Sequence, residues 1–449
     1  MDTILTCDNG IAAIDEIAWA KAQKMTVLVT DHHAVPFEEH EGRRTEKKSL
    51  ADAVVNPHQQ DCGYPYKELC GAGVAWNVIR VLYENYDMDK REAEDLLDFV
   101  AMATVCDVMS LTGENRILVK EGLKRIRHTK NIGLQALMQA CNVQPENISA
   151  YHFGYVLGPC VNATGRLDTA RHALRLFETG QETEAEEIAR DLVDLNQERK
   201  ELTLQGVEMA KKICEEGGYE NDPVLVLFLP DVHESIAGLI AGRIREMYNR
   251  PVFVLTRGEE GVKGSGRSTE NYSMYENMCG CAELFTKFGG HPMAAGLSLP
   301  EENVEKFRRK INENCPLTVE EVCPDIHIDM AMPVGYASTE LVHQFALLEP
   351  FGKDNPSPLF ADGICPSAAC VDRKEPECSS DECSFGIRTA GSGYFLLGMW
   401  RRCLHILPKS LVKKRWRMRC MEEKTGFYFL WCIQQRLIFI REMKICSWR

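Results

Sequence analysis

The chain has 449 residues, of which 45% are hydrophobic, and a formal net charge of −14. This length accommodates two to four domains, and no apolar run reaches the roughly 18–20 residues that span a bilayer, which excludes a membrane-embedded class. The N-terminus has no secretory pattern, so we expect a cytoplasmic protein. Its 19 cysteines follow no disulfide or metal-ligand spacing and are expected to be reduced.

Charge is unevenly distributed. From Cys365 onward there are 16 Lys and Arg against 8 Asp and Glu, so this segment is +8 and the remainder is −22. An acidic main body does not by itself indicate nucleic-acid binding. A local basic groove is nevertheless sufficient for it.

Two short strands are predicted at the start of the chain. Thr3–Cys7 and Thr26–Thr30 are apolar, β-branched runs, which is typical of buried strands. Apolar residues at helical spacing between positions 11 and 24 connect them. A strand–helix–strand unit of this length makes its two strands parallel, so their carboxyl ends meet at one edge of the sheet.

Each of these strands ends in side chains that can bind a metal. Asp8 follows the first, and Asp31, His32 and His33 follow the second. Ligands of open α/β sheets bind just outside the carboxyl ends of the strands, and Asp with His suits Mn, Mg or Zn. We therefore predict a metal site there. Helix capping by the two carboxylates is the alternative.

The next hundred residues add one more candidate ligand. Residues 34–50 are polar and predict a solvated surface loop, Val54–Pro57 resembles a further strand end, and a helix begins near Cys70. An apolar helix over residues 96–105 ends next to Asp107. This carboxylate is either a ligand or a helix cap.

A helical connector follows. Residues 115–140 and 185–216 have helical periodicity. Between them, residues 158–166 predict a loop bracketed by glycines. Its Asn162 and Arg166 could bind an anion, because a guanidinium donates two parallel N–H groups to a phosphate. An ordinary turn explains this segment equally well.

A second α/β lobe is predicted from residue 223. Its expected elements are strands over residues 224–229 and 251–256 and a helix over residues 233–248. Residues 288–296 predict a loop of small residues around His291, whose backbone N–H groups and imidazole suit a phosphate chain. A tight structural turn would explain its glycines but not the histidine.

Several motifs in this order resemble the DHH phosphoesterase family, and within it the single-stranded-DNA-specific 5′→3′ exonucleases, over residues 1 to about 362. The motifs are Asp8-Asn-Gly, Val29-Thr-Asp-His-His33, Cys106-Asp-Val108, Asn162-Ala-Thr-Gly-Arg166, Gly266-Arg-Ser268, Phe288-Gly-Gly-His-Pro-Met-Ala-Ala-Gly296, Asp325-Ile-His-Ile-Asp329 and Phe351-Gly-Lys-Asp-Asn-Pro-Ser-Pro-Leu-Phe360.

The resemblance implies two α/β lobes joined by a helical connector, followed by the start of an OB-like β domain and an irregular tail. The implied boundaries are 1–112 for an incomplete parallel-sheet DHH domain, 113–204 for the connector, 205–320 for the DHH-associated substrate-binding domain, 324–362 for the OB-like start and 363–449 for the tail.

The resemblance also implies metal-dependent phosphodiester hydrolysis with Mn²⁺ or Mg²⁺, two ions about 3.5–4 Å apart activating a water and stabilising the leaving oxygen. If each motif has the same role here as in the family, Asp8 bridges the two metals, and His32 and Asp107 bind one of them. Asp31 supports His32, and His33 contacts the scissile phosphate or a metal-bound water.

The implied substrate is single-stranded DNA, which the OB-like domain would feed in by stacking and charge, and the protein is expected to be a monomer. The residues expected to hold phosphates are Asn162, Arg166, Arg267, Ser268, Gly289, Gly290 and His291.

Two departures from the family pattern lead to further expectations. An Asp-x-Asp motif that precedes Asp8 in the family is absent, so one of the two metal sites would be incomplete, and we expect weak or no nuclease activity. After Phe360 the pattern stops, and the tail holds 8 of the 19 cysteines and 4 of the 6 tryptophans. We interpret the tail as frame-shifted or disordered sequence, with a basic, aromatic nucleic-acid-binding tail as the alternative.

Three other functions remain open from the sequence. One is a DHH oligoribonuclease or cyclic-dinucleotide phosphodiesterase, although such enzymes are shorter and lack the long connector. Another is a fragment that binds single strands without cutting them. The third is a structural remnant without a partner.

Overall fold

The structure is a computed structural model that describes residues 2–40, 43–167, 170–258, 261–318, 321, 327–332, 336–362, 429–432 and 436–439. The chain divides into two compact units, described separately below. One comprises Met1–Pro324 with Leu348–Pro356, and the other comprises Asp325–Leu347 with Ser357–Arg449.

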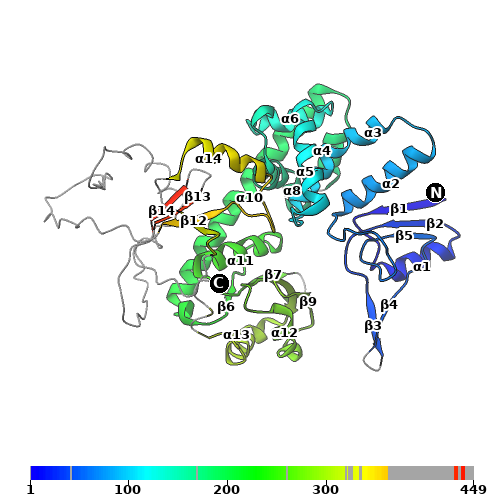
Figure 1. Ribbon diagram of the computed structural model, residues 1–449. Coiled ribbons are helices and arrows are strands. Elements are labelled where there is room, and N and C mark those ends of the chain that lie inside the picture. Colours follow the sequence, from blue (N-terminus) through cyan, green and yellow to red (C-terminus); the bar gives the residue numbers. More distant parts are fainter. Residues whose placement is uncertain are drawn as a thin grey trace, which may run out of the picture. The chain divides into compact units, whose positions relative to one another are not determined.

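The first unit begins with a parallel sheet in the order β1-β2-β5, formed by Thr3–Cys7, Thr26–Thr30 and Ala53–Val55. Cys7 is in register with Thr30, and Thr30 with Val55. Helix α1 (Ile14–Ala22) connects the first two strands, and Figure 1 shows it on the opposite side of the sheet from α2. The predicted strand–helix–strand unit is confirmed.

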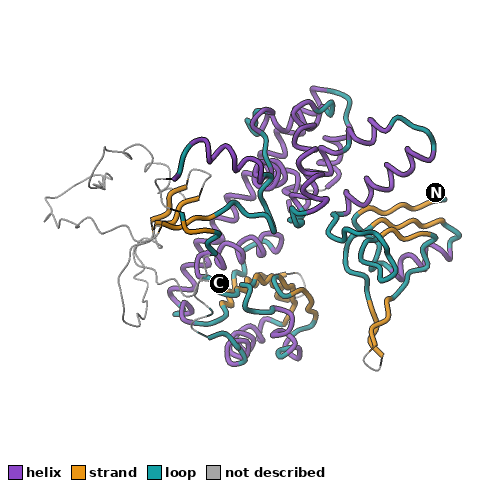
Figure 2. The backbone as a smooth tube through the Cα atoms, in the orientation of Figure 1, coloured by secondary structure: helices purple, strands orange, loops and turns teal. Residues whose placement is uncertain are grey.

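The polar segment predicted to be a solvated loop is instead a hairpin. Strands β3 (Phe37–His40) and β4 (Arg43–Glu46) pair antiparallel, with Phe37 opposite Glu46, and they extend from the first sheet as two orange strands in Figure 2. The prediction for residues 34–50 was wrong because a two-stranded ribbon whose described side chains are mostly exposed needs no alternation of apolar and polar residues.

A largely helical region follows. Its α-helices are α2 (Gly71–Asn85), α3 (Lys90–Asp95), α4 (Leu97–Cys106), α5 (Gly113–Arg125), α6 (Ile132–Ala140), α7 (Ala150–His152), α8 (Gly158–Leu167), α9 (Ala170–Glu178) and α10 (Glu182–Glu216), with a π-helical turn, η3 (Phe153–Leu157). Short 3-10 turns are η1 (Ile126–His128) and η2 (Pro145–Asn147).

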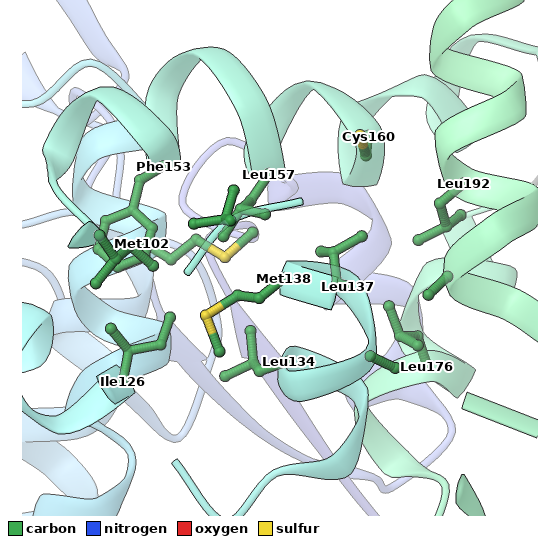
Figure 3. Close-up of a cluster of buried hydrophobic side chains, with 14 of the residues drawn as sticks. Met102, Ile126, Leu134, Leu137, Met138, Phe153, Leu157, Cys160, Leu176 and Leu192 are labelled. Atoms are coloured by element: carbon green, nitrogen blue, oxygen red, sulfur yellow. The ribbon is translucent and has the colours of Figure 1, made fainter. Parts of the chain in front are cut away.

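These helices share one hydrophobic core. Leu134, Leu137, Phe153, Leu157 and Leu192 are fully buried in it and converge from α6, η3 and α10 (Figure 3). Helix α10 packs against α6 and α8 and also against α11 of the next domain. No helix among the described residues combines the length and apolar character needed to cross a membrane.

The second domain of this unit is a mixed sheet in the order β6-β7-β8-β10-β9. Its strands are β6 (Leu225–Phe228), β7 (Val252–Gly258), β8 (Gly261–Arg267), β9 (Lys287–His291) and β10 (Ala294–Leu299), and its helices are α11 (Glu234–Tyr248), α12 (Met274–Cys279) and α13 (Val304–Glu313). Its 3-10 turns are η4 (Tyr219–Asn221), η5 (Ala282–Leu284) and η6 (Glu301–Asn303). Among the described strands of this sheet, β6 and β7 pair parallel and the other neighbours pair antiparallel.

The other unit contains a four-stranded sheet in the order β11-β12-β13-β14, formed by Met330–Ala331, Leu359–Asp362, Phe429–Cys432 and Arg436–Phe439. Helix α14 (Thr339–Gln344) and the turn η8 (Phe345–Leu348) precede β12. Within the described part of the chain these strands form an open sheet rather than a closed barrel. Apart from β13 and β14, the tail over residues 363–449 lies outside the described residues, as does its interpretation as frame-shifted sequence.

Candidate functional site

The expected metal-binding side chains lie together at the carboxyl edge of the first sheet. Asp8 follows β1 and donates its backbone N–H to Thr30 across a distance of 3.0 Å, which ties it to the end of β2. The Nε2 atom of His32 lies 2.9 Å from Oδ1 of Asp8 and 3.4 Å from Oδ2 of Asp107. Asp107 ends helix α4, so three separate elements bring these side chains together.

The chemistry of these side chains fits a divalent cation. His32 is only 9% exposed, yet its buried Nε2 has no hydrogen-bond partner of proper geometry among the described residues. A buried ring nitrogen facing two carboxylates is costly to leave unpaired, and a cation would satisfy all three groups. Ligand atoms of Asp8, His32 and His33 lie within 4.8 Å of one another, so His33 also lies within reach of the site.

Asp31 is the anchor of the Asp-His-His sequence. Its carboxylate, 1% exposed, accepts hydrogen bonds from the backbone N–H groups of Ile11, His32 and His33 and from Nδ1 of His33, the last at 2.7 Å. Burial opposes ionisation of Asp31, but these hydrogen bonds outweigh burial and lower its pKa. The family resemblance implies that Asp31 supports the ring of His32. The structure places it behind the ring of His33 instead, with only the backbone of His32 in contact.

Backbone strain marks the same edge. Asp8 has a φ of 59° and Val108, directly after Asp107, has a φ of 55°. A β-branched residue rarely adopts a positive φ, and such strain persists where the surrounding structure imposes it, frequently at functional sites. The sequence gives no local signal for the strain at Val108.

A glycine allows helix α2 to approach the site closely. A Cβ on Gly71 would lie 2.4 Å from both Cβ and Oδ1 of Asp8. Gly71 thus lets the start of helix α2 pack directly against a candidate ligand. Its role was visible in the sequence as a small residue at a helix start, but the packing partner was not.

A distant segment of the first unit also lies beside the site. Leu111 donates its backbone N–H to the carbonyl of Lys353 at 2.8 Å, and Arg116 donates to the carbonyl of Glu349 at 3.1 Å. Burial raises the pKa of Asp107, and the charges of His32, His33 and Lys353 oppose this effect. Lys353 therefore contributes positive charge at the site, which sequence reasoning missed.

The second domain brings two of the expected phosphate-binding residues into one row. Arg267 on β8 is in register with Ala294 on β10, and Ala294 with His291 on β9. Side chains directly opposite each other on antiparallel strands share a face, so Arg267 and His291 lie on one face, two strand spacings or about 10 Å apart. Gly238 of α11 leaves room for the guanidinium, because a Cβ there would lie 2.7 Å from its Nη2.

A hollow of about 510 Å³ lies on this domain. Its lining includes Lys263, Ser265, Lys287 and Gly289. Ser268 is not presented there, since it is 1% exposed and donates its hydroxyl to the carbonyl of Tyr272 at 2.5 Å. The expected contact of Ser268 with phosphate therefore does not fit the structure.

Two segments predicted as loops are regular elements. Gly289, Gly290 and His291 belong to strand β9, and Asn162 and Arg166 belong to helix α8. Asn162 is exposed, while the side chain of Arg166 lies outside the described residues. The loop predictions were wrong at these residues, because Gly158 and Gly290 make room for packed neighbours. The turn of the second segment lies at Pro292 and Met293, between β9 and β10.

Two sequence models of phosphoesterase domains match this chain. The sequence model of the "DHH family, N-terminal domain" matches residues 2–104, and that of the "DHHA1 domain" matches residues 221–315. The chain belongs to the DHH phosphoesterase family.

Within this family the chain is similar to RecJ. It is 33% identical over 359 residues to the single-stranded-DNA-specific exonuclease RecJ of Bacillus subtilis, a match that covers 79% of this chain and 44% of that protein. The crystal structure of RecJ from Thermus thermophilus in complex with Mn²⁺ matches with a TM-score of 0.68 and 31% identity, over 82% of this chain and 53% of that one. A structure of exonuclease RecJ bound to manganese matches with a TM-score of 0.58 and 31% identity, over 71% of this chain and 76% of that one. The chain spans about half the length of the curated relative it matches.

Proposed function

We propose that this chain is a metal-dependent phosphodiesterase of the RecJ type, which removes nucleotides from the 5′ end of single-stranded DNA with Mn²⁺ or Mg²⁺. The convergence of Asp8, His32 and Asp107 around an unpaired buried ring nitrogen is the observation that carries the proposal. The similarity to RecJ exonucleases supports the choice of substrate.

The chain's own residues would bind and orient the scissile phosphate. The Nδ1 atom of His33 is engaged by Asp31, which leaves Nε2 of His33 to donate a hydrogen bond to a phosphate oxygen. The hydrogen bond with Asp31 raises the pKa of His33, which favours that donor role. A bound divalent cation would activate water and stabilise the leaving oxygen.

The second domain would hold the strand. Arg267 and His291 share a face of its sheet, and Arg binds phosphate through a planar fork of N–H groups. A single strand whose reacting phosphate is held by the first domain would have neighbouring phosphates held here. The proposed phosphate contacts also include Gly289 and Gly290 on β9 of this domain. Outside it, they include Asn162 and Arg166 on α8 of the helical region.

The proposed ligands would hold one ion directly. The described residues supply one set of ligands, Asp8, His32 and Asp107, with Asp8 available to share with a second ion. Two-metal hydrolysis needs both ions to be held. Binding of a single strand without cleavage is the second candidate function, and the single set of ligands among the described residues favours it.

The test compares Mn²⁺ binding with hydrolysis. We expect the purified chain to bind Mn²⁺ in calorimetry and to release mononucleotides from 5′-phosphorylated single-stranded DNA, but not from the matching duplex. His32→Ala should abolish both. Faster cleavage of dinucleotides than of long single strands would contradict the RecJ-type assignment. A cytoplasmic location and a monomeric state complete the proposal.

A further inference from the structure

Two tyrosines stack on the surface of the helical region. Tyr151 is 57% exposed and Tyr155 is 71% exposed. Their ring centroids lie 5.1 Å apart and their planes differ by 23°. The pair is therefore a nearly parallel aromatic stack that remains open to solvent.

The same helical turn is anchored firmly beneath the tyrosines. Phe153 and Leu157, which alternate with them in sequence, are 0% exposed and point into the core shown in Figure 3. Ser149 and His152 form a capping box that fixes the start of the turn. The turn itself is π-helical, a geometry that occurs frequently at functional sites.

This turn packs on the last turn of the helix that ends at the metal site. Cys106 donates its thiol to the carbonyl of Phe153 at 3.4 Å. A Cβ on Gly158 would lie 2.3 Å from the sulfur of Cys106, and Cys106 directly precedes Asp107. The tyrosine pair therefore stands on an element in direct contact with the edge of the metal centre.

The turn also continues without a break into α8. This helix carries Asn162, which is exposed. The stacked rings show that Tyr151 and Tyr155 lie on one side of the turn, and Asn162 is exposed on the helix that continues it. A strand whose phosphate meets Asn162 would pass with its bases near the two rings.

We propose that Tyr151 and Tyr155 form a stacking platform for the bases of a single strand as it reaches the metal centre. The inference rests on the proposed function and adds to it a binding site for nucleobases. Every base has a π face, so such a platform suits an enzyme that degrades strands of any sequence. The rings would align the strand while the phosphate contacts hold it.

The test measures binding of a 5′-phosphorylated oligodeoxynucleotide of about 12 nucleotides, a length within the usual range of single-strand sites. Fluorescence titration in EDTA, with 2-aminopurine in the strand, reports affinity and stacking without cleavage. The variants are Tyr151→Ala/Tyr155→Ala and the ring-preserving Tyr151→Phe/Tyr155→Phe. Tyr86→Ala is the matched control, because Tyr86 is 75% exposed at the end of α2.

We expect the double alanine variant to bind about 5- to 150-fold more weakly, the loss expected for one stacked base, and to lose the quenching of 2-aminopurine. The double phenylalanine variant and Tyr86→Ala should bind like the unaltered chain. An abasic strand of the same length should bind the unaltered chain as weakly as the normal strand binds the double alanine variant, and this arm requires no variant to fold.

The outcomes separate this inference from the proposed function. If the unaltered chain binds no single strand, both are overturned. If it binds normal and abasic strands equally, or if the double alanine variant binds normally, the platform is overturned while the proposed function stands. In that case the exposed rings are better assigned to contact with another protein.

Discussion

The two sheets of the first unit place their functional groups in different ways. In the parallel sheet β1-β2-β5, Asp8 and the Asp31-His32-His33 sequence lie at strand ends, where neighbouring strands terminate together. In the mixed sheet β6-β7-β8-β10-β9, Arg267 and His291 lie along one face, in register across three strands.

The difference follows from the size of what each sheet would bind. A single cation needs oxygen and nitrogen atoms that converge within a few ångströms, and the ends of parallel strands supply such a point. A nucleic-acid backbone is extended, so its phosphates require donors spread over a surface. The predictions below test whether metal binding and strand binding are divided between the two sheets in this way.

The largest change in binding is expected when a histidine of either sheet is replaced, in two separate single variants. His32→Ala should lower Mn²⁺ affinity by at least about 100-fold, more than the loss caused by removing a hydrogen-bond partner of a ligand. His291→Ala should leave Mn²⁺ affinity unchanged and weaken binding of a single strand. Calorimetry with Mn²⁺ and fluorescence anisotropy with the strand in EDTA measure the two properties. If both variants lost both Mn²⁺ affinity and single-strand binding, the proposed division of these two functions between the two sheets would be wrong.

A smaller effect is expected from the guanidinium of the second sheet. Arg267→Gln should weaken single-strand binding about 10- to 100-fold, the range for a lost charged hydrogen bond, and lower the slope of log affinity against log salt by about 1. Arg309→Gln removes the same charge from an exposed position on α13 and serves as the control. Equal losses in the two variants would show that only net charge matters.

A third prediction concerns the close approach of helix α2 to the metal site. Gly71→Ala should lower Mn²⁺ affinity about tenfold, comparable to disturbing a ligand's support, because the added methyl group would displace Asp8. Gly73→Ala is the control two residues away, where an added Cβ would make only ordinary contacts of 3.5 Å or more. Unchanged Mn²⁺ affinity in Gly71→Ala would show that Asp8 is not a ligand.

The smallest effect is expected on the stability of the second domain. Gly290 has a φ of 154°, and a Cβ there would lie 2.6 Å from Cα of Ala295. Gly290→Ala should therefore lower the unfolding free energy by about 1–2 kcal/mol. Gly289→Ala should be nearly neutral, since nothing lies within 4 Å of its added Cβ. Thermal unfolding followed by circular dichroism compares the two variants, and equal melting temperatures would contradict the prediction.

Local pattern predicted much of this fold. Short apolar runs predicted β1, β2, β6 and α4, and helical periodicity predicted α10, because each pattern reflects how an element is buried. The helix predicted over residues 233–248 is α11. The candidate ligands Asp8, His32 and Asp107 were recognisable because carboxylates and imidazoles at the ends of apolar elements are costly without a role. The connection from strand to helix to strand also required Asp8 and Asp31 to lie at the same edge.

Glycine-rich segments were the main failure. The sequence predicts loops around Gly158 and Gly290, yet one lies in a helix and the other in a strand. At both positions the glycine makes room for a neighbour that is distant in sequence or across the sheet, Cys106 in one case and Ala295 in the other. A sequence reveals that a residue is small but does not reveal which neighbour requires it to be small.

The sequence by itself determined which residue types could bind a metal and which strand ends would carry them, because those features depend on residues close together in the chain. Only the tertiary structure decided that Asp31 holds His33, that Gly71 touches Asp8 and that Lys353 contributes charge near Asp107. These contacts depend on the angle at which packed elements meet, and that angle is set by many side chains acting together.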